Sequence, residues 1–159
     1  MSRPAAFPSL VPDVFSYTTK SSEDRLYFEG VLTPSARLAS DQNRLDAIEH
    51  LLDLSDRYRY ENWDGEGAEP IPEAAIQEAR EFLKKLTSWV PLPEIVPEPD
   101  GYLGLEWCAN KWLLYVVSFN GKGAISCSGL MGSERVYGTR FMDDGVPADI
   151  IRNIVRVFR

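Results

Sequence analysis

The chain has 159 residues, of which 44% are hydrophobic and 26% are charged, and its formal net charge is −7. This length fits one domain better than two, and this composition excludes a chain that is disordered throughout. No apolar run approaches the roughly 20 residues of a membrane-spanning helix, and the proline-interrupted N-terminus predicts no signal peptide. Only two cysteines are present, so we expect no disulfide framework and a cytoplasmic location.

Acidic charge is concentrated in the first half of the chain. Residues 1–80 contain 15 Asp and Glu against 8 Lys and Arg, whereas residues 81–159 contain 9 of each. Nucleic-acid binding needs clustered basic side chains, so this distribution argues against a nucleic-acid partner. It is compatible with a basic protein partner, and solubility is the simpler interpretation.

The first 38 residues are predicted to form an irregular N-terminal arm, because they contain four of the eleven prolines and a polar run at residues 18–24. The apolar segment at residues 26–32 can form an edge strand, or it can become ordered on a partner. We expect residues 39–159 to form a single domain.

A first long helix is predicted from Ser40, which, like Asp41, can cap the first free amides. Apolar side chains recur there at spacings of three, four and seven, and they predict one buried face. These side chains are Leu45, Ile48, Leu51, Leu52 and Tyr58. The opposite face carries four acids: Asp46, Glu49, Asp53 and Asp56. We interpret it as a solvated face or as a contact surface for a cation-rich partner.

Two further helices are predicted, with a sheet between them. One begins near Pro72, a residue suited to a first helical turn, and the other runs from Pro147 to the end of the chain. Alternating and apolar segments predict strands at residues 94–96, 102–107, 112–117, 122–128 and 135–142. The expected fold class is α+β, in which an antiparallel meander of four or five strands packs against two central helices and a C-terminal helix.

Two motifs carry a resemblance. They are the loop at residues 62–68 (NWDGEGA) and the segment at residues 99–107 (PDGYLGLEW). Together they resemble a group of small bacterial proteins with a WDGxGA loop and a PDGxxxLEW strand, which have no assigned activity and occur near mobile elements and toxin–antitoxin-like gene pairs. The resemblance covers about residues 60–120. It implies a shared fold and transfers no catalytic residues.

The first motif has a structural and a chemical interpretation. In the structural one, its glycines permit positive backbone angles, Asp64 accepts bonds from the amides of the turn, and Trp63 fills a gap between the helices and the sheet. In the chemical one, four acids form a site that binds a hard cation or acts as an acid–base pair. These acids are Asp64, Glu66, Asp100 and Glu106. The single histidine, His50, lies at the edge of the predicted buried face and offers too little for a triad or a zinc site.

Three function classes remain open. The leading hypothesis is a non-enzymatic protein-interaction module, the antitoxin-like or immunity-like member of a bacterial gene pair, without a cofactor and with no membrane partner. Its expected contact residues for a basic protein partner are Trp63, Asp46, Glu49, Asp53 and Asp56. The second is a small toxin or effector that blocks a host protein, and the third is a metal-dependent enzyme built on the acidic set.

Overall fold

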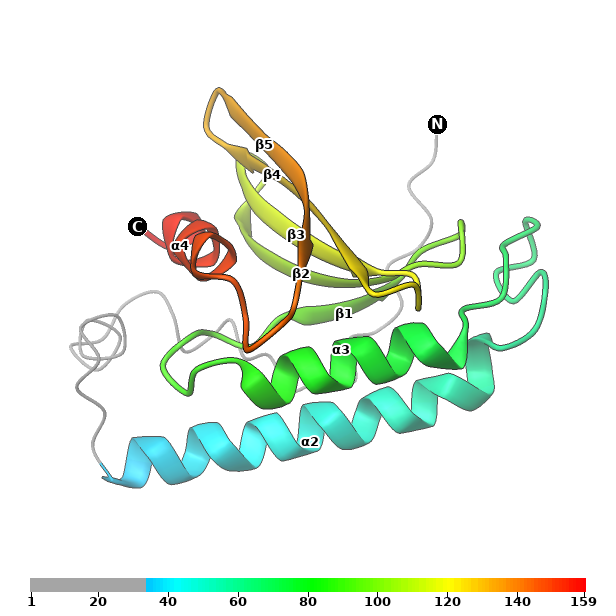
Figure 1. Ribbon diagram of the computed structural model, residues 1–159, viewed down its shortest axis with the longest axis horizontal. Helices are drawn as coiled ribbons and strands as arrows, with labels where there is room; N and C mark the ends of the chain where they lie inside the picture. Colours follow the sequence, from blue (N-terminus) through cyan, green and yellow to red (C-terminus); the bar gives the residue numbers. More distant parts are fainter. Residues whose placement is uncertain (1–33) are drawn as a thin grey trace.

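The computed structural model describes residues 34–159, which form three helices and a five-stranded sheet (Figure 1). The helices are α2 (Pro34–Tyr58), α3 (Glu73–Lys85) and α4 (Ala148–Val157). The expected edge strand at residues 26–32, and all of the N-terminal arm up to residue 33, lie outside the described residues.

The strands form an antiparallel meander, as the sequence predicts, and each strand pairs with the next one along the chain. They are β1 (Glu94–Pro97), β2 (Leu103–Asn110), β3 (Leu113–Phe119), β4 (Ala124–Met131) and β5 (Glu134–Phe141). Among the described residues β1 pairs with β2 alone, so it has the edge position that the sequence predicts. The α+β fold class is therefore confirmed.

The three helices lie on one side of the sheet in two layers (Figure 1). Helices α3 and α4 contact the sheet, whereas α2 packs mainly on α3 and forms the outer layer. Between α3 and the sheet, the ring of Phe82 lies 5.4 Å from that of Phe119 and 6.4 Å from that of Trp107. Trp107 is fully buried, and its indole Nε1–H donates to the carbonyl of Pro91 at 2.7 Å. This aromatic cluster is the centre of the core.

Helix α2 begins at Pro34, earlier than the expected start at Ser40. Ser40 is buried, and its hydroxyl donates to the carbonyl of Ser88 at 2.8 Å, so the predicted capping role is wrong. The proline at the new start suits a first helical turn, where its missing N–H has no intrahelical partner to lose. The helix also passes without a break through the expected boundary between the arm and the domain.

The face that α2 buries differs from the predicted one. Its members are Ala47, Ile48, Leu51, Leu54 and Tyr58. The prediction that Leu45 and Leu52 belong to this face is wrong, since they are exposed. Apolar spacings of three, four and seven can describe two separate lines on one helix, and only one of these lines meets α3.

Helix α3 fixes the turn between β3 and β4. The carboxylate of Glu78 accepts hydrogen bonds from the backbone N–H groups of Gly121 at 2.8 Å and Gly123 at 2.6 Å. Gly121 has a φ of 78°, and a Cβ there would lie 2.8 Å from the Cβ of Ala74, so only glycine fits. Because hydrogen bonds to a charged acceptor are stronger than neutral ones, this contact ties the helix to the sheet.

In the part of the chain that the structure describes, strand β5 forms the second edge of the sheet. Its two-residue turn with β4 sets the hydrogen-bonding register, and in this register the Thr139 carbonyl faces the open edge. Arg140 donates to that carbonyl at 2.8 Å, and its Nε–H donates to Asp149 of α4 at 2.6 Å. Gly138 leaves room for the guanidinium, since a Cβ there would lie 2.8 Å from an Arg140 nitrogen.

Helix α4 covers the remaining part of the same sheet face. Pro147 is its N-cap, which confirms the expected start, and Ile150, Ile154 and Val157 are fully buried. An ion pair of 2.6 Å between Arg156 and Glu134 joins it to the start of β5. Within residues 34–159, no helix combines the length and apolar character that a bilayer crossing requires.

Candidate functional site

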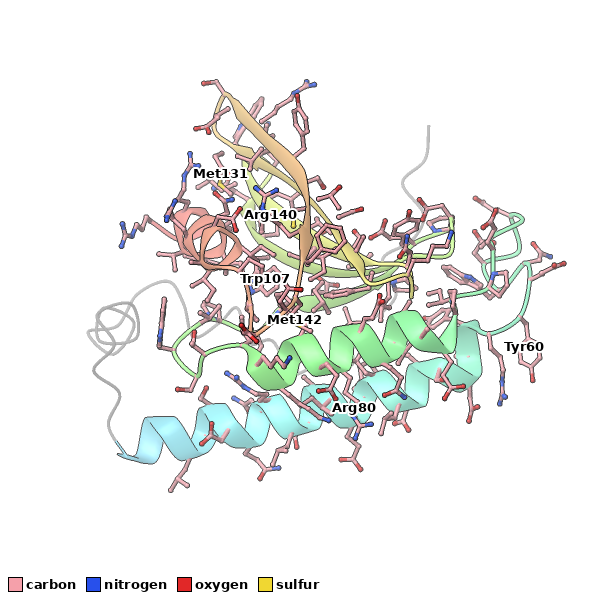
Figure 2. All side chains as sticks on the ribbon, viewed as in Figure 1. Tyr60, Arg80, Trp107, Met131, Arg140 and Met142 are labelled. Atoms are coloured by element: carbon pink, nitrogen blue, oxygen red, sulfur yellow. The ribbon has the colours of Figure 1, made fainter. Side chains whose placement is uncertain are left out.

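One line of apolar side chains on α2 faces the solvent. Leu38, Leu45 and Leu52 are 72%, 59% and 42% exposed. Seven residues make nearly two helical turns, so three leucines spaced by seven lie along one side of the helix. Many side chains of α2 project away from α3 and the rest of the domain (Figure 2), and the exposure of the three leucines is consistent with a place among them. We call these three residues the leucine line.

Exposed carboxylates border the leucine line. They are Asp41, Asp46, Glu49, Asp53 and Asp56, and we call them the acidic border. Asp46 accepts a hydrogen bond from Gln42 at 2.9 Å, and Asp56 pairs with Arg59. The ion pairs formed within residues 34–159 involve neither Glu49 nor Asp53. The structure thus gathers four of the five predicted interaction residues on one helix face, beside Leu45 and Leu52, which were expected to be buried.

The fifth predicted interaction residue, Trp63, is placed differently. Its side chain is half-buried, and its indole N–H donates to the carbonyl of Glu69 at 2.9 Å. Its ring meets that of Tyr58 edge-on, with 4.7 Å between the centroids. These contacts close the loop at residues 62–68 onto the end of α2, which is a packing role.

Asp64 braces the same loop. One carboxylate oxygen accepts from the backbone N–H of Glu66 at 2.8 Å and from that of Ala68 at 3.0 Å. The hydrogen bonds from Glu66 and Ala68 hold the pKa of Asp64 below its usual range, because they stabilise the charged form. Asn62, at a φ of 58°, likewise accepts from the N–H of Gly67 at 2.7 Å through its side chain.

We expect Asp64→Ala to lower the melting temperature by several degrees and Asp64→Asn to lower it much less. The asparagine keeps a side-chain oxygen that can accept from both amides, whereas alanine leaves them without this acceptor. Thermal unfolding followed by circular dichroism measures both variants. A rise in melting temperature with a divalent cation that Asp64→Asn abolishes would contradict the bracing role and indicate a metal site.

The four acids of the proposed acidic site occupy three different places. Asp64 and Glu66 lie in the loop at residues 62–68, and Asp100 lies in the turn before β2. Glu106 lies within β2, opposite Glu94 of β1. Among the described residues, no three His, Cys, Asp or Glu side chains are grouped so that they can hold a metal ion.

A carboxyl group is partly buried on the sheet face opposite the helices. Glu98 accepts a hydrogen bond from the hydroxyl of Ser118 at 2.6 Å. It lies over Gly104, where a Cβ would be 2.6 Å from its Oε1. Burial raises the pKa of Glu98, the hydrogen bond from Ser118 partly opposes this shift, and the negative charge of Asp100 adds to it.

Glu98 is expected to make the protein less stable as the pH rises. Its folded-state pKa lies above the ordinary value of 4.5, so its contribution is fully present below about pH 4.5 and is lost as the pH rises through the folded-state pKa. Glu98→Gln keeps an acceptor for Ser118 without the charge. The variant should therefore have a higher urea midpoint than the wild type at neutral pH and a similar one at about pH 4. Equal midpoints at both pH values would contradict this role.

Neither the histidine nor the cysteines belong to a metal-binding group among the described residues. His50 is half-buried beside the buried face of α2, as predicted. Cys108 and Cys127 lie on opposite faces of the sheet, with β3 between their strands, and no disulfide joins them. Burial raises the pKa of Cys127, which is typical of an unreactive core thiol.

Sequence reasoning missed the leucine line, together with Glu78 and Glu98. The regular spacing of Leu38, Leu45 and Leu52 is visible in the sequence and is the signal that could have separated the leucine line from the buried face. For Glu78 and Glu98 no such signal exists, because their partners lie 43 and 20 residues away along the chain.

No protein-family model matches the chain, and no curated protein and no solved structure matches it significantly. Within residues 34–159, the leucine line with its acidic border is a continuous exposed apolar feature on one helix that packing inside the domain does not explain.

Proposed function

We propose that this protein is a non-enzymatic interaction module that binds a basic protein partner through helix α2. The observation that carries the proposal is the leucine line inside the acidic border. Exposed leucines gain free energy when a partner removes them from water. Carboxylates around them favour a partner with Lys and Arg around its own apolar contact.

The antitoxin-like or immunity-like member of a bacterial gene pair is the role that we propose for this module. Such a role needs a stable complex and neither a catalytic residue nor a cofactor. The motifs at residues 62–68 and 99–107, which resemble those of proteins near toxin–antitoxin-like gene pairs, support it. The absence of a disulfide between Cys108 and Cys127 fits the cytoplasmic location that the proposal includes.

A small toxin or effector that blocks a host protein would use the same surface, and it is the second candidate. Expression in a host that lacks the gene pair separates the two roles. Growth arrest supports the toxin, whereas normal growth together with protection from a co-expressed basic neighbour supports the immunity role.

Replacing both Leu45 and Leu52 by glutamate is expected to weaken partner capture at least about tenfold, because it removes the centre of the apolar contact. Both side chains are exposed, so the fold should tolerate the change with a shift of only a few degrees in melting temperature. Affinity purification from the native host, with quantitative mass spectrometry of co-purifying proteins, measures the loss.

Tyr137→Glu is the matched control, since Tyr137 is 83% exposed on β5, away from α2. The control should capture the partner at the wild-type level. Equal capture by the double leucine variant would refute a role for α2. Recovery of the wild-type protein alone, as a monomer, would refute the interaction module itself.

A further inference from the structure

Resting on the function proposed above, we infer that the partner segment recognised by α2 is itself an α-helix, basic and amphipathic, which lies along α2 as in a two-stranded coiled coil. The inference defines the shape and the charge pattern of the partner. It follows from the spacing of the leucine line, from the side chains between the leucines and from the charge of the acidic border.

The spacing of the leucine line matches a helical partner. Leu38 and Leu52 are fourteen residues apart, which is about 21 Å along the helix axis. Apolar residues that repeat every seven positions along two helices keep facing each other when the helices cross at a small angle. An extended strand places side chains on one face about every 7 Å, so it would match the leucines, about 10 Å apart, poorly.

The side chains between the leucines are polar, and this sets the chemistry of the partner. When the leucines take the d positions of the heptads, the a positions fall on Gln42, Glu49 and Asp56. The other assignment, with the leucines at a, would need Ile48 at a contact position, and Ile48 is buried inside the domain. Gln42, Glu49 and Asp56 belong to the exposed side of α2. Layers of leucine therefore alternate with layers that are polar or acidic. A partner helix with Leu or Ile opposite the leucines and Lys or Arg opposite Glu49 and Asp56 satisfies both kinds of layer.

The same pattern disfavours pairing of α2 with a second copy of itself. In a parallel pair Glu49 would face Glu49 of the other copy, and in an antiparallel pair leucines would face carboxylates. The first arrangement brings like charges together, and the second buries a charge against an apolar side chain without compensation. The acidic border adds further repulsion, because five exposed acids on one α2 would approach five on the other. The surface thus selects a different, basic helix.

The test uses a synthetic peptide of three heptads with leucine at one contact position and lysine at the other and at the flanking positions. Two comparison peptides have the same composition. In the first comparison peptide the leucines are distributed around the helix, so that they form no line. All three peptides carry a proline at one end, and in the second comparison peptide this proline exchanges places with a central lysine, which breaks the helix. Fluorescence anisotropy of labelled peptides with the full-length protein measures Kd. We expect the in-register peptide to bind at least about tenfold more tightly than either comparison peptide, and Leu45→Glu to abolish this difference.

Equal affinity of the three peptides would overturn the helical partner, while capture of a native partner that depends on Leu45 and Leu52 would leave the proposed function intact. Capture that does not depend on these leucines would overturn both. Sedimentation of the protein alone should show a monomer at micromolar concentration. A dimer that Leu45→Glu dissociates would overturn the choice of a different helix as partner.

Discussion

Replacing Trp107 by alanine is expected to lower the free energy of unfolding by about 4 kcal/mol, which is typical of a buried aromatic residue. The indole lies between α3 and the sheet without any exposed surface. Its removal leaves a cavity beside Phe82 and deprives the carbonyl of Pro91 of its hydrogen bond, which is 2.7 Å in the native fold. A domain of ordinary stability has only about 5–15 kcal/mol to lose.

Urea denaturation followed by far-ultraviolet circular dichroism measures this loss. Trp112→Ala is the control, because Trp112 lies in the turn between β2 and β3 and is 58% exposed, with the ammonium of Lys111 5.2 Å from its ring centroid. We expect it to cost less than about 1 kcal/mol. If the two variants had the same urea midpoint, Trp107 would not be at the centre of the core.

The second large effect is expected at α4, where Ile154→Asp should prevent the domain from folding. Ile154 is fully buried between α4 and the sheet. A carboxylate at this position must either remain charged without a partner or become protonated, and each costs several kcal/mol in addition to the lost apolar contacts. We expect the variant to be insoluble or to lack a cooperative unfolding transition.

Arg152→Asp provides the control on the same helix, since Arg152 is exposed. It should remain folded, with a free energy of unfolding within about 1 kcal/mol of the wild type. A soluble Ile154→Asp variant with a cooperative transition close to that of the wild type would show that α4 contributes little to the core.

The sheet could be predicted because its signals are local. Alternation around Leu103, Leu105 and Trp107 shows which side is buried, and Asn120 followed by Gly121 is typical of a hairpin turn. The prolines that flank residues 94–96 identify β1 as an edge strand. Each signal is contained within a few residues, and the meander joins neighbours in the chain.

Which apolar side chains of α2 are buried and which are exposed could not be predicted from local signals. Leu45 and Leu51 are both compatible with one helical period, and only the position of α3 decides which of them is covered. Ser40 resembles a helix cap in the sequence, yet its hydroxyl donates to Ser88, 48 residues away. The candidate site could therefore be predicted only in part. The acids Asp46, Glu49, Asp53 and Asp56 were identified as a contact surface, but Leu45 and Leu52 beside them were assigned to the core.

The sequence also could not show whether the four acids of the predicted acidic site lie close together in space. Asp64 and Asp100 each lie in a glycine-containing turn, and the sequence does not reveal that the carboxylate of Asp64 already accepts two backbone amides. Glu106 alternates with buried residues along β2, so the strand directs it to the sheet face opposite the helices. The two motif regions meet, through the hydrogen bond from the Glu69 N–H to the Pro99 carbonyl at 2.8 Å, but among the described residues their acids form no group of three that could hold a metal ion.

The two edge strands of the sheet limit how many copies of the chain can assemble. Strand β1 is short, and its Pro97 has no N–H to donate to an added strand from another chain. At β5, an added strand would have to displace Arg140 from the Thr139 carbonyl, and this would weaken the ion pair between Arg140 and Asp149. Growth of the sheet from chain to chain is thereby disfavoured at both borders, in the way that natural proteins resist fibre formation. Any complex that this protein forms through α2 should consequently be closed and of fixed stoichiometry, since both edge strands of the sheet in residues 34–159 resist extension.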